Sequence, residues 1–166
     1  MYEKSIELLN RAVADEIAAV HQYMYFHFHC NDQGYDLLSG LFRTTSMQEM
    51  LHAELLAERI LFLKGEVELV ASGPVQQVHD VQQMLEIAKK SEETAVRNYN
   101  LWANECAANA DSVSKKLFET LVGEEEVHYD RFYTELENIS KFGAQYLALQ
   151  SIERSKTIAA GPTTAA

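Results

Sequence analysis

Two short segments of this chain share a pattern, a glutamate followed three residues later by a histidine. The first pair is Glu49 and His52 and the second is Glu125 and His128, with 76 residues between equivalent positions. Both pairs lie in long stretches of helical periodicity, and residues three apart on an α-helix share one face. Each pair therefore directs one carboxylate and one imidazole toward a common point. This pattern favours a helical fold that carries polar groups in its interior.

The composition is that of one folded, largely helical domain. The chain has 166 residues, of which 47% are apolar, with only 2 prolines and 7 glycines. The net charge of −11 argues against a general nucleic-acid binder and suits a protein that gathers cations, although solubility alone also explains it. No run approaches 18 uninterrupted apolar residues, so we expect no membrane span. Residues 1–10 show no signal peptide, and Cys30 and Cys106 have no paired spacing, which fits a reducing cytoplasm.

Apolar residues recur every three or four positions along most of the chain. We expect four long helices and a short fifth one, over residues 3–31, 37–64, 80–106, 113–142 and 144–154. Gly65 is expected to end the second helix, and Asp111 or Ser112 to cap the fourth. Residues 155–166 are small and polar, so we expect a domain over residues 1–154 followed by a disordered tail.

The lengths of the connections predict how the helices are arranged. Short links join the first helix to the second and the third to the fourth, so each pair should be antiparallel. The 14-residue connection over residues 66–79 is long enough to cross the bundle and make the second and third helices parallel. The expected fold is therefore an all-α, ferritin-like four-helix bundle with a long crossover and a short C-terminal fifth helix.

Two further glutamates complete a candidate metal site. Glu16 and Glu92 lie about 12 or 13 residues into the first and third helices, at a depth similar to that of Glu49 and Glu125 in theirs. A single glutamate is more often on the surface than a ligand, but matched depth on four helices reverses that prior. Ferritin-like bundles bind two iron or manganese ions with this donor set. The candidate ligands are Glu16, Glu49, His52, Glu92, Glu125 and His128.

Several other residues have more than one interpretation. Tyr23 lies seven residues after Glu16 on the same face, so it either hydrogen-bonds a ligand, gives up an electron, or packs in the core. The remaining histidines lack a ligand-spaced acid or thiolate, and we interpret them as core or surface residues: His21, His27, His29 and His79.

The chain resembles the bacterioferritins over residues 4–154. The segments that carry the resemblance are NRAVADEIAAVHQY at 10–23, QEMLHAELLAERILFLKG at 48–65, GEEEVHYDRFYTEL at 123–136 and QYLALQSIER at 145–154. The resemblance implies a cytoplasmic homo-oligomeric cage of 24 subunits. In such a cage Fe(II) is oxidised by oxygen or peroxide at a di-iron centre within each subunit, and ferric mineral is stored inside.

The resemblance also assigns roles to individual residues. The six ligands serve as the catalytic groups, with Glu16 and Glu92 terminal, Glu49 and Glu125 bridging, and His52 and His128 each capping one ion. It further implies that Met50 is an axial ligand of haem b shared between two subunits. The alternative is a methionine that packs a dimer interface, with Met47 on a similar side.

The chain departs from the family at some positions, and two other functions stay open. Thr44 and Gln48 replace a histidine and an aspartate that assist iron transfer in some members. Cys30 and Cys106 should lie near opposite ends of the bundle as free thiols. The alternatives are a ferritin-like peroxidase or oxygenase that stores nothing, and a dodecameric mini-ferritin cage. The absence of Cys-x-x-Cys pairs and the expected fifth helix count against these two.

Overall fold

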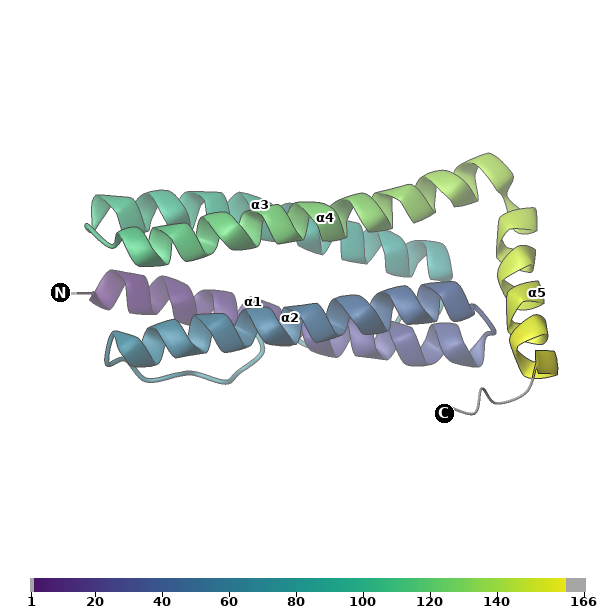
Figure 1. The fold of residues 1–166 in the computed structure, drawn as a ribbon, viewed down its shortest axis with the longest axis horizontal. Coiled ribbons are helices and arrows are strands. Elements are labelled where there is room, and N and C mark those ends of the chain that lie inside the picture. The colour runs from purple at the N-terminus through teal and green to yellow at the C-terminus, as the bar shows by residue number, and fades with distance from the viewer. Residues whose placement is uncertain (1, 161–166) are drawn as a thin grey trace.

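The computed structural model describes residues 2–160, and these form five helices without a strand. The helices are α1 (Glu3–Asp32), α2 (Asp36–Phe62), α3 (Val81–Ala108), α4 (Ser112–Phe142) and α5 (Ala144–Ala160). In Figure 1, α1 and α2 form one antiparallel pair and α3 and α4 form a second, while α2 and α3 run in the same direction. The expected ferritin-like four-helix bundle with a crossover and a fifth helix is confirmed.

The crossover between α2 and α3 is held against α1 by side-chain amides. Asn10 Nδ2 donates to the Glu66 carbonyl and Asn10 Oδ1 accepts from Glu68 N, each at 2.9 Å. Gln22 forms the same two-way contact with the backbone of Gln76, at 3.0 and 2.7 Å. These amides satisfy backbone groups of a segment that has no helical partners of its own.

The ends of the helices follow the expected signals, with one difference. Asp111 caps α4 by accepting from Ser114 N at 3.1 Å. At the end of α2, Lys64 rather than Gly65 adopts the positive φ, at 65°. Gly65 is needed for another reason, since a Cβ there would lie 2.7 Å from Ile6 Cγ2. The glycine therefore allows the chain to pass close to α1.

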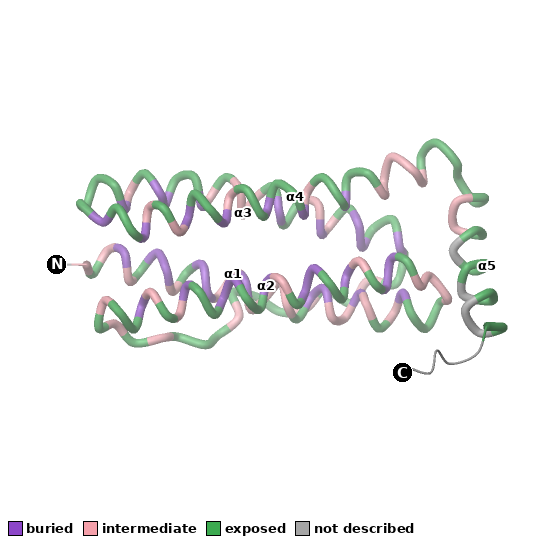
Figure 2. Tube along the Cα trace, in the orientation of Figure 1, coloured by how far each residue is buried: buried purple, intermediate pink, exposed green. Residues whose placement is uncertain are grey.

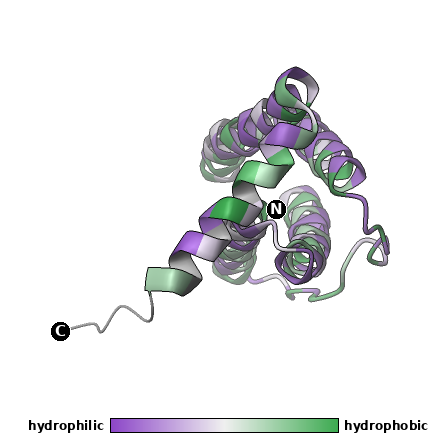
Figure 3. Cartoon of the chain, turned by 90° about the vertical axis from the view of Figure 1, so that its right-hand side faces the viewer, coloured by the Kyte–Doolittle hydropathy of each residue, from purple (hydrophilic) through white to green (hydrophobic). Residues whose placement is uncertain are grey.

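α5 lies across the end of the bundle, as Figures 1 and 3 show. Gly143, with a φ of 56°, makes the sharp turn out of α4. α5 continues to Ala160, so the expected end of the fifth helix at residue 154 is wrong. Helical periodicity weakens after residue 154, but the local propensity of the following residues still supports a helix. The rest of the expected tail, residues 161–166, lies outside the described residues.

The buried side chains form two apolar clusters, and Figure 2 shows the buried positions along the inward faces of the four long helices. The first cluster is centred on Trp102 and Phe118 and includes Leu8 and Ile60. The second is centred on Phe42 and Phe132. Cys30 belongs to the second cluster and Cys106 to the first, and both are free thiols, as expected. No helix within residues 2–160 is long and apolar enough to cross a membrane.

Candidate metal centre

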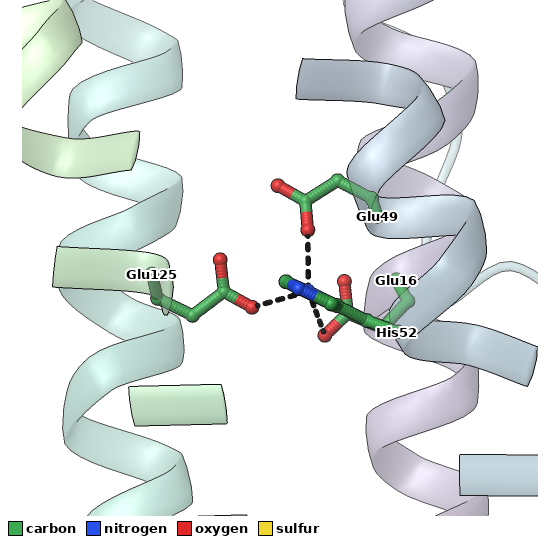
Figure 4. A group of neighbouring side chains, drawn as sticks. All are labelled: Glu16, Glu49, His52 and Glu125. Atoms are coloured by element: carbon green, nitrogen blue, oxygen red, sulfur yellow. Dashed lines mark hydrogen bonds and ion pairs between the residues drawn. The ribbon is translucent and has the colours of Figure 1, made fainter. Parts of the chain in front are cut away.

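The structure brings together all six candidate ligands in a layer between the two apolar clusters. One comes from α1, two from α2, one from α3 and two from α4, and each is buried. We call this set the ligand layer: Glu16, Glu49, His52, Glu92, Glu125 and His128. Figure 4 shows one half of it, with three carboxylates directed at His52.

The ligand layer contains two overlapping sets of metal-binding atoms. In one set, Glu16 and His52 join Glu49 and Glu125, and the ligand atoms lie within 4.8 Å of one another. In the other, Glu92 and His128 join the same two glutamates. Two glutamates common to both sets can bridge two ions, because a carboxylate has two oxygens to offer. The arrangement fits two cations side by side.

The shared glutamates divide their oxygens evenly between the two imidazoles. His52 Nδ1 lies 3.0 Å from Glu125 Oε1 and 2.9 Å from Glu49 Oε2. His128 Nδ1 lies 3.0 Å from Glu125 Oε2 and 2.9 Å from Glu49 Oε1. Each imidazole therefore presents Nδ1 to the centre of the layer, where a metal ion would accept its lone pair.

Protons compensate the carboxylates when no cation is bound. Burial lowers the pKa of His128, but contacts with Glu125 and Glu49 outweigh it and raise that pKa to about 9. Burial also lowers the pKa of His52, but the carboxylates of Glu125, Glu16 and Glu49 outweigh this effect. The pKa of His52 therefore lies well above its ordinary value. Burial opposes ionisation of Glu125, yet the two imidazoles hold its pKa down to about 2. The carboxylates of the layer therefore favour the protonated, positively charged form of both imidazoles.

Two buried tyrosines hold the outer carboxylates. The Tyr23 hydroxyl donates to Glu92 Oε1, and the Tyr99 hydroxyl donates to Glu16 Oε1. Burial and then the neighbouring glutamates raise the pKa of both carboxyls and both phenols, so the phenols remain donors. The first interpretation of Tyr23, a hydrogen bond to a ligand, is confirmed. Sequence reasoning missed Tyr99, although it follows Glu92 by seven residues, as Tyr23 follows Glu16.

The carboxylate oxygens of Glu49 are the ones in the layer that hydrogen bonds leave unsatisfied. Both of its carboxylate oxygens are buried, and neither has a hydrogen-bond partner. The two imidazole nitrogens lie 2.9 Å away but outside hydrogen-bond geometry. Buried carboxylate oxygens without partners are strongly unfavourable, and two bridged cations would satisfy both at once. Carboxylate and imidazole donors without thiolate suit iron or manganese.

The outer nitrogens of the two imidazoles have different partners. His52 Nε2 lies 2.6 Å from Glu124 Oε2, and His128 Nε2 lies 3.0 Å from Gln48 Oε1. The same Gln48 oxygen accepts from Arg131 Nη1 at 3.2 Å. The sequence analysis did not single out Glu124, because its partner is 72 residues away.

A cavity of about 650 Å³ reaches the ligand layer between α1 and α3. The crossover lines one side of it with Ser72 and Pro74, and Asp15 and Glu86 add carboxylates. Its inner wall includes Glu16, Glu49, Glu92 and Glu125. The layer is therefore open to small ions although its side chains are buried.

The other candidate residues lie away from the layer. Met50 and Met47 are 44% and 46% exposed on the outside of α2. Thr44 is exposed one turn before Gln48. Among the described residues, the four remaining histidines join no group of metal-binding side chains. His79 stacks on His29 at 4.3 Å, and His27 Nδ1 contacts Ser39.

The fold and the ligand layer define a ferritin-like protein, and a family model for the ferritin-like domain matches residues 6–142. Curated bacterioferritins are similar over most of their length. The one from Brucella melitensis is 37% identical, covering 86% of this chain and 88% of the relative, and the one from Rhodobacter capsulatus is 35% identical, covering 88% and 91%. The chain belongs to the bacterioferritin family.

A solved structure of the Desulfovibrio desulfuricans bacterioferritin agrees with this fold. It superimposes with a TM-score of 0.87 at 33% identity, covering 89% of this chain and 86% of that one. That structure is described as showing the di-iron site in different catalytic states. The carboxylate and histidine groups of this chain support a di-iron centre of the same kind.

Proposed function

We propose that this protein is an iron-storage ferroxidase that oxidises Fe(II) within each subunit and stores ferric mineral in a hollow cage. The observation that carries the proposal is the buried layer of four glutamates and two histidines on four helices. Membership of the bacterioferritin family supports the same function.

Each ligand has a distinct part in this proposal. Glu49 and Glu125 bridge the two metal positions, because both belong to each metal-binding set. Glu16 with His52, and Glu92 with His128, complete one position each. When bound, the iron pair supplies two electrons to oxygen or peroxide. Tyr23 and Tyr99 orient the outer carboxylates, and the imidazoles surrender their Nδ1 protons as Fe(II) arrives.

The shell of 24 identical subunits is part of the proposal. α5 supports it over the dodecameric alternative, since mini-ferritins generally lack a fifth helix and place iron between subunits. Here both metal positions are complete within one chain. The cytoplasm remains the proposed compartment, and both cysteines staying free is consistent with a reducing environment.

Haem b bound through Met50 is a separate part of the proposal. The residues fit, because Met50 is exposed on α2 beside other exposed apolar side chains, including Met47 and Leu51. A twofold contact between two such faces would offer two thioethers to one haem iron, which would supply an electron-transfer centre. A Soret band in the purified protein, lost in Met50→Leu, would support this assignment, and its absence after haem loading would defeat it.

Replacing both bridging residues tests the main proposal. Glu49→Ala with Glu125→Ala should abolish fast Fe(II) oxidation, while the mass of the oligomer in solution stays unchanged. The matched control is Glu54→Ala with Glu126→Ala, which removes two exposed glutamates from the same helices and should keep full activity. Fast oxidation retained in the first variant would overturn the proposal. Iron that never exceeds two ions per chain would favour the peroxidase or oxygenase alternative.

A further inference from the structure

The ligand layer is nearly symmetric inside, but its two histidines are supported differently from outside. His52 Nε2 meets the carboxylate of Glu124 at 2.6 Å. His128 Nε2 meets the neutral amide oxygen of Gln48 at 3.0 Å. The offset of 76 residues that relates the ligands also relates Gln48 to Glu124, so the two partners occupy equivalent positions on α2 and α4 and differ only in their chemistry.

The hydrogen-bond partner of Nε2 affects how strongly the Nδ1 atom of the same imidazole binds a cation. Carboxylate and amide oxygens only accept hydrogen bonds at these positions, so each Nε2 carries the hydrogen and donates it. Nδ1 is then left to offer its lone pair toward Glu49 and Glu125. An anionic acceptor draws the Nε2 hydrogen more strongly and makes the imidazole a better electron donor.

Arg131 increases the difference between the two sides. Its Nη1 donates to the same Gln48 oxygen that accepts from His128, at 3.2 Å. The acceptor is therefore shared, and a positive charge lies behind His128. Among the described residues, no lysine or arginine pairs with Glu124, whose side chain is 52% exposed.

We propose that Glu124 and Gln48 are positioning residues that make the two metal positions unequal, the one beside His52 binding a divalent cation more tightly than the one beside His128. The inference rests on the proposed function, because it requires both positions to bind metal. The position beside His128 then exchanges its ion more readily, while the other retains it. Second-sphere partners of this kind change metal affinity by about 10- to 100-fold.

Stepwise Co(II) titration of the metal-free protein tests the proposal through two isosteric substitutions. Glu124→Gln should weaken the first binding step about tenfold, and Gln48→Glu should strengthen the second about tenfold. Each single variant therefore narrows the gap between the two dissociation constants. The double variant exchanges the two partners and should widen the gap again.

Two controls separate hydrogen bonding from general charge. Glu126→Gln removes an exposed carboxylate two residues from Glu124, and Thr44→Glu adds one a turn before Gln48. Both should leave the ratio of the two constants within about twofold of the wild type. Equal changes in the controls and the test variants would overturn the proposal, as would single variants that leave the ratio unchanged.

Anomalous diffraction identifies which position fills first. Crystals given one Co(II) per chain should show the ion beside His52, and the Glu124→Gln, Gln48→Glu double variant should show it beside His128. Equal occupancy, or first filling beside His128 in the wild type, would contradict the proposal. A wild-type protein that never binds two Co(II) per chain would instead defeat the proposed function, so the two failures are distinguishable.

Discussion

The ligand layer and the apolar clusters on either side of it obey opposite physical rules. In the second cluster, the ring centroid of Phe42 lies 5.2 Å from that of Phe26 and 5.5 Å from that of Phe132. Close packing of such rings stabilises the fold. In the layer, burial and then the neighbouring carboxylates raise the pKa of both Glu16 and Glu92. The clusters hold four helices at the spacing that the layer needs. This bundle accepts a locally unfavourable centre because its two ends are well packed.

The largest effect on stability is expected from a cluster. Phe132 is fully buried against Tyr23 and Phe42, so Phe132→Ala should lower the free energy of unfolding by about 3–5 kcal/mol. Denaturant unfolding of the metal-free protein measures the change. Phe142→Ala, at an exposed position of the same helix, should change it by less than about 0.5 kcal/mol. Similar losses in both variants would mean that the cluster does not hold the bundle together.

A metal ion bound in the ligand layer should raise the free energy of unfolding. A cation that binds only the folded chain, present at about a hundred times its dissociation constant, adds about 2.7 kcal/mol per site. Co(II) should therefore raise the unfolding midpoint of the wild type, whereas Glu49→Ala with Glu125→Ala should show no such shift. Protection that persists in the double variant would place the metal elsewhere.

The pH dependence of the metal-free protein should have a defined sign. The pKa of His128 is raised to about 9 from an ordinary 6.5, so the folded chain binds more protons than the unfolded chain between these values. Its contribution to stability is complete below pH 6.5 and is lost as the pH rises through about 9. The slope contributed by one such proton is at most about 1.4 kcal/mol per pH unit. Unfolding measured from pH 6.5 to 9 should show a fall that His128→Gln reduces, and a rise would contradict the charge assignment.

The smallest effect should come from the two tyrosines. Tyr99→Phe and Tyr23→Phe each remove one hydrogen bond that a hydroxyl donates to a buried carboxyl. Each substitution should lower the free energy of unfolding by about 1 kcal/mol. Because the two contacts are equivalent across the layer, their losses should agree. Tyr133→Phe, at a partly exposed position, is the control and should be neutral. Unequal losses would show that the layer is asymmetric inside as well as outside.

The sequence predicted the fold and the grouping of the six candidate ligands because both depend on local, repeated patterns. Long apolar periodicity defines the four helices, and a 14-residue crossover leaves few topologies open. The paired Glu-x-x-His segments locate four of the candidate ligands, and matched depth locates Glu16 and Glu92.

What the sequence did not predict depends on contacts between distant residues. Glu124 resembles its acidic neighbours until the fold places it 2.6 Å from His52. Gly65 resembles an ordinary helix stop, but its role is to allow the approach of Ile6. The extent of α5 was underestimated because its last residues are compatible with both a helix and a disordered tail.

A crystal structure of the Co(II)-saturated protein tests the central claim most directly. The account predicts two ions in each chain, both bound by Glu49 and Glu125, with one ion on His52 Nδ1 and the other on His128 Nδ1. Glu16 and Glu92 should each complete one of the two positions. A single ion, or ions bound outside the bundle with Glu16 and Glu92 turned toward solvent, would contradict it.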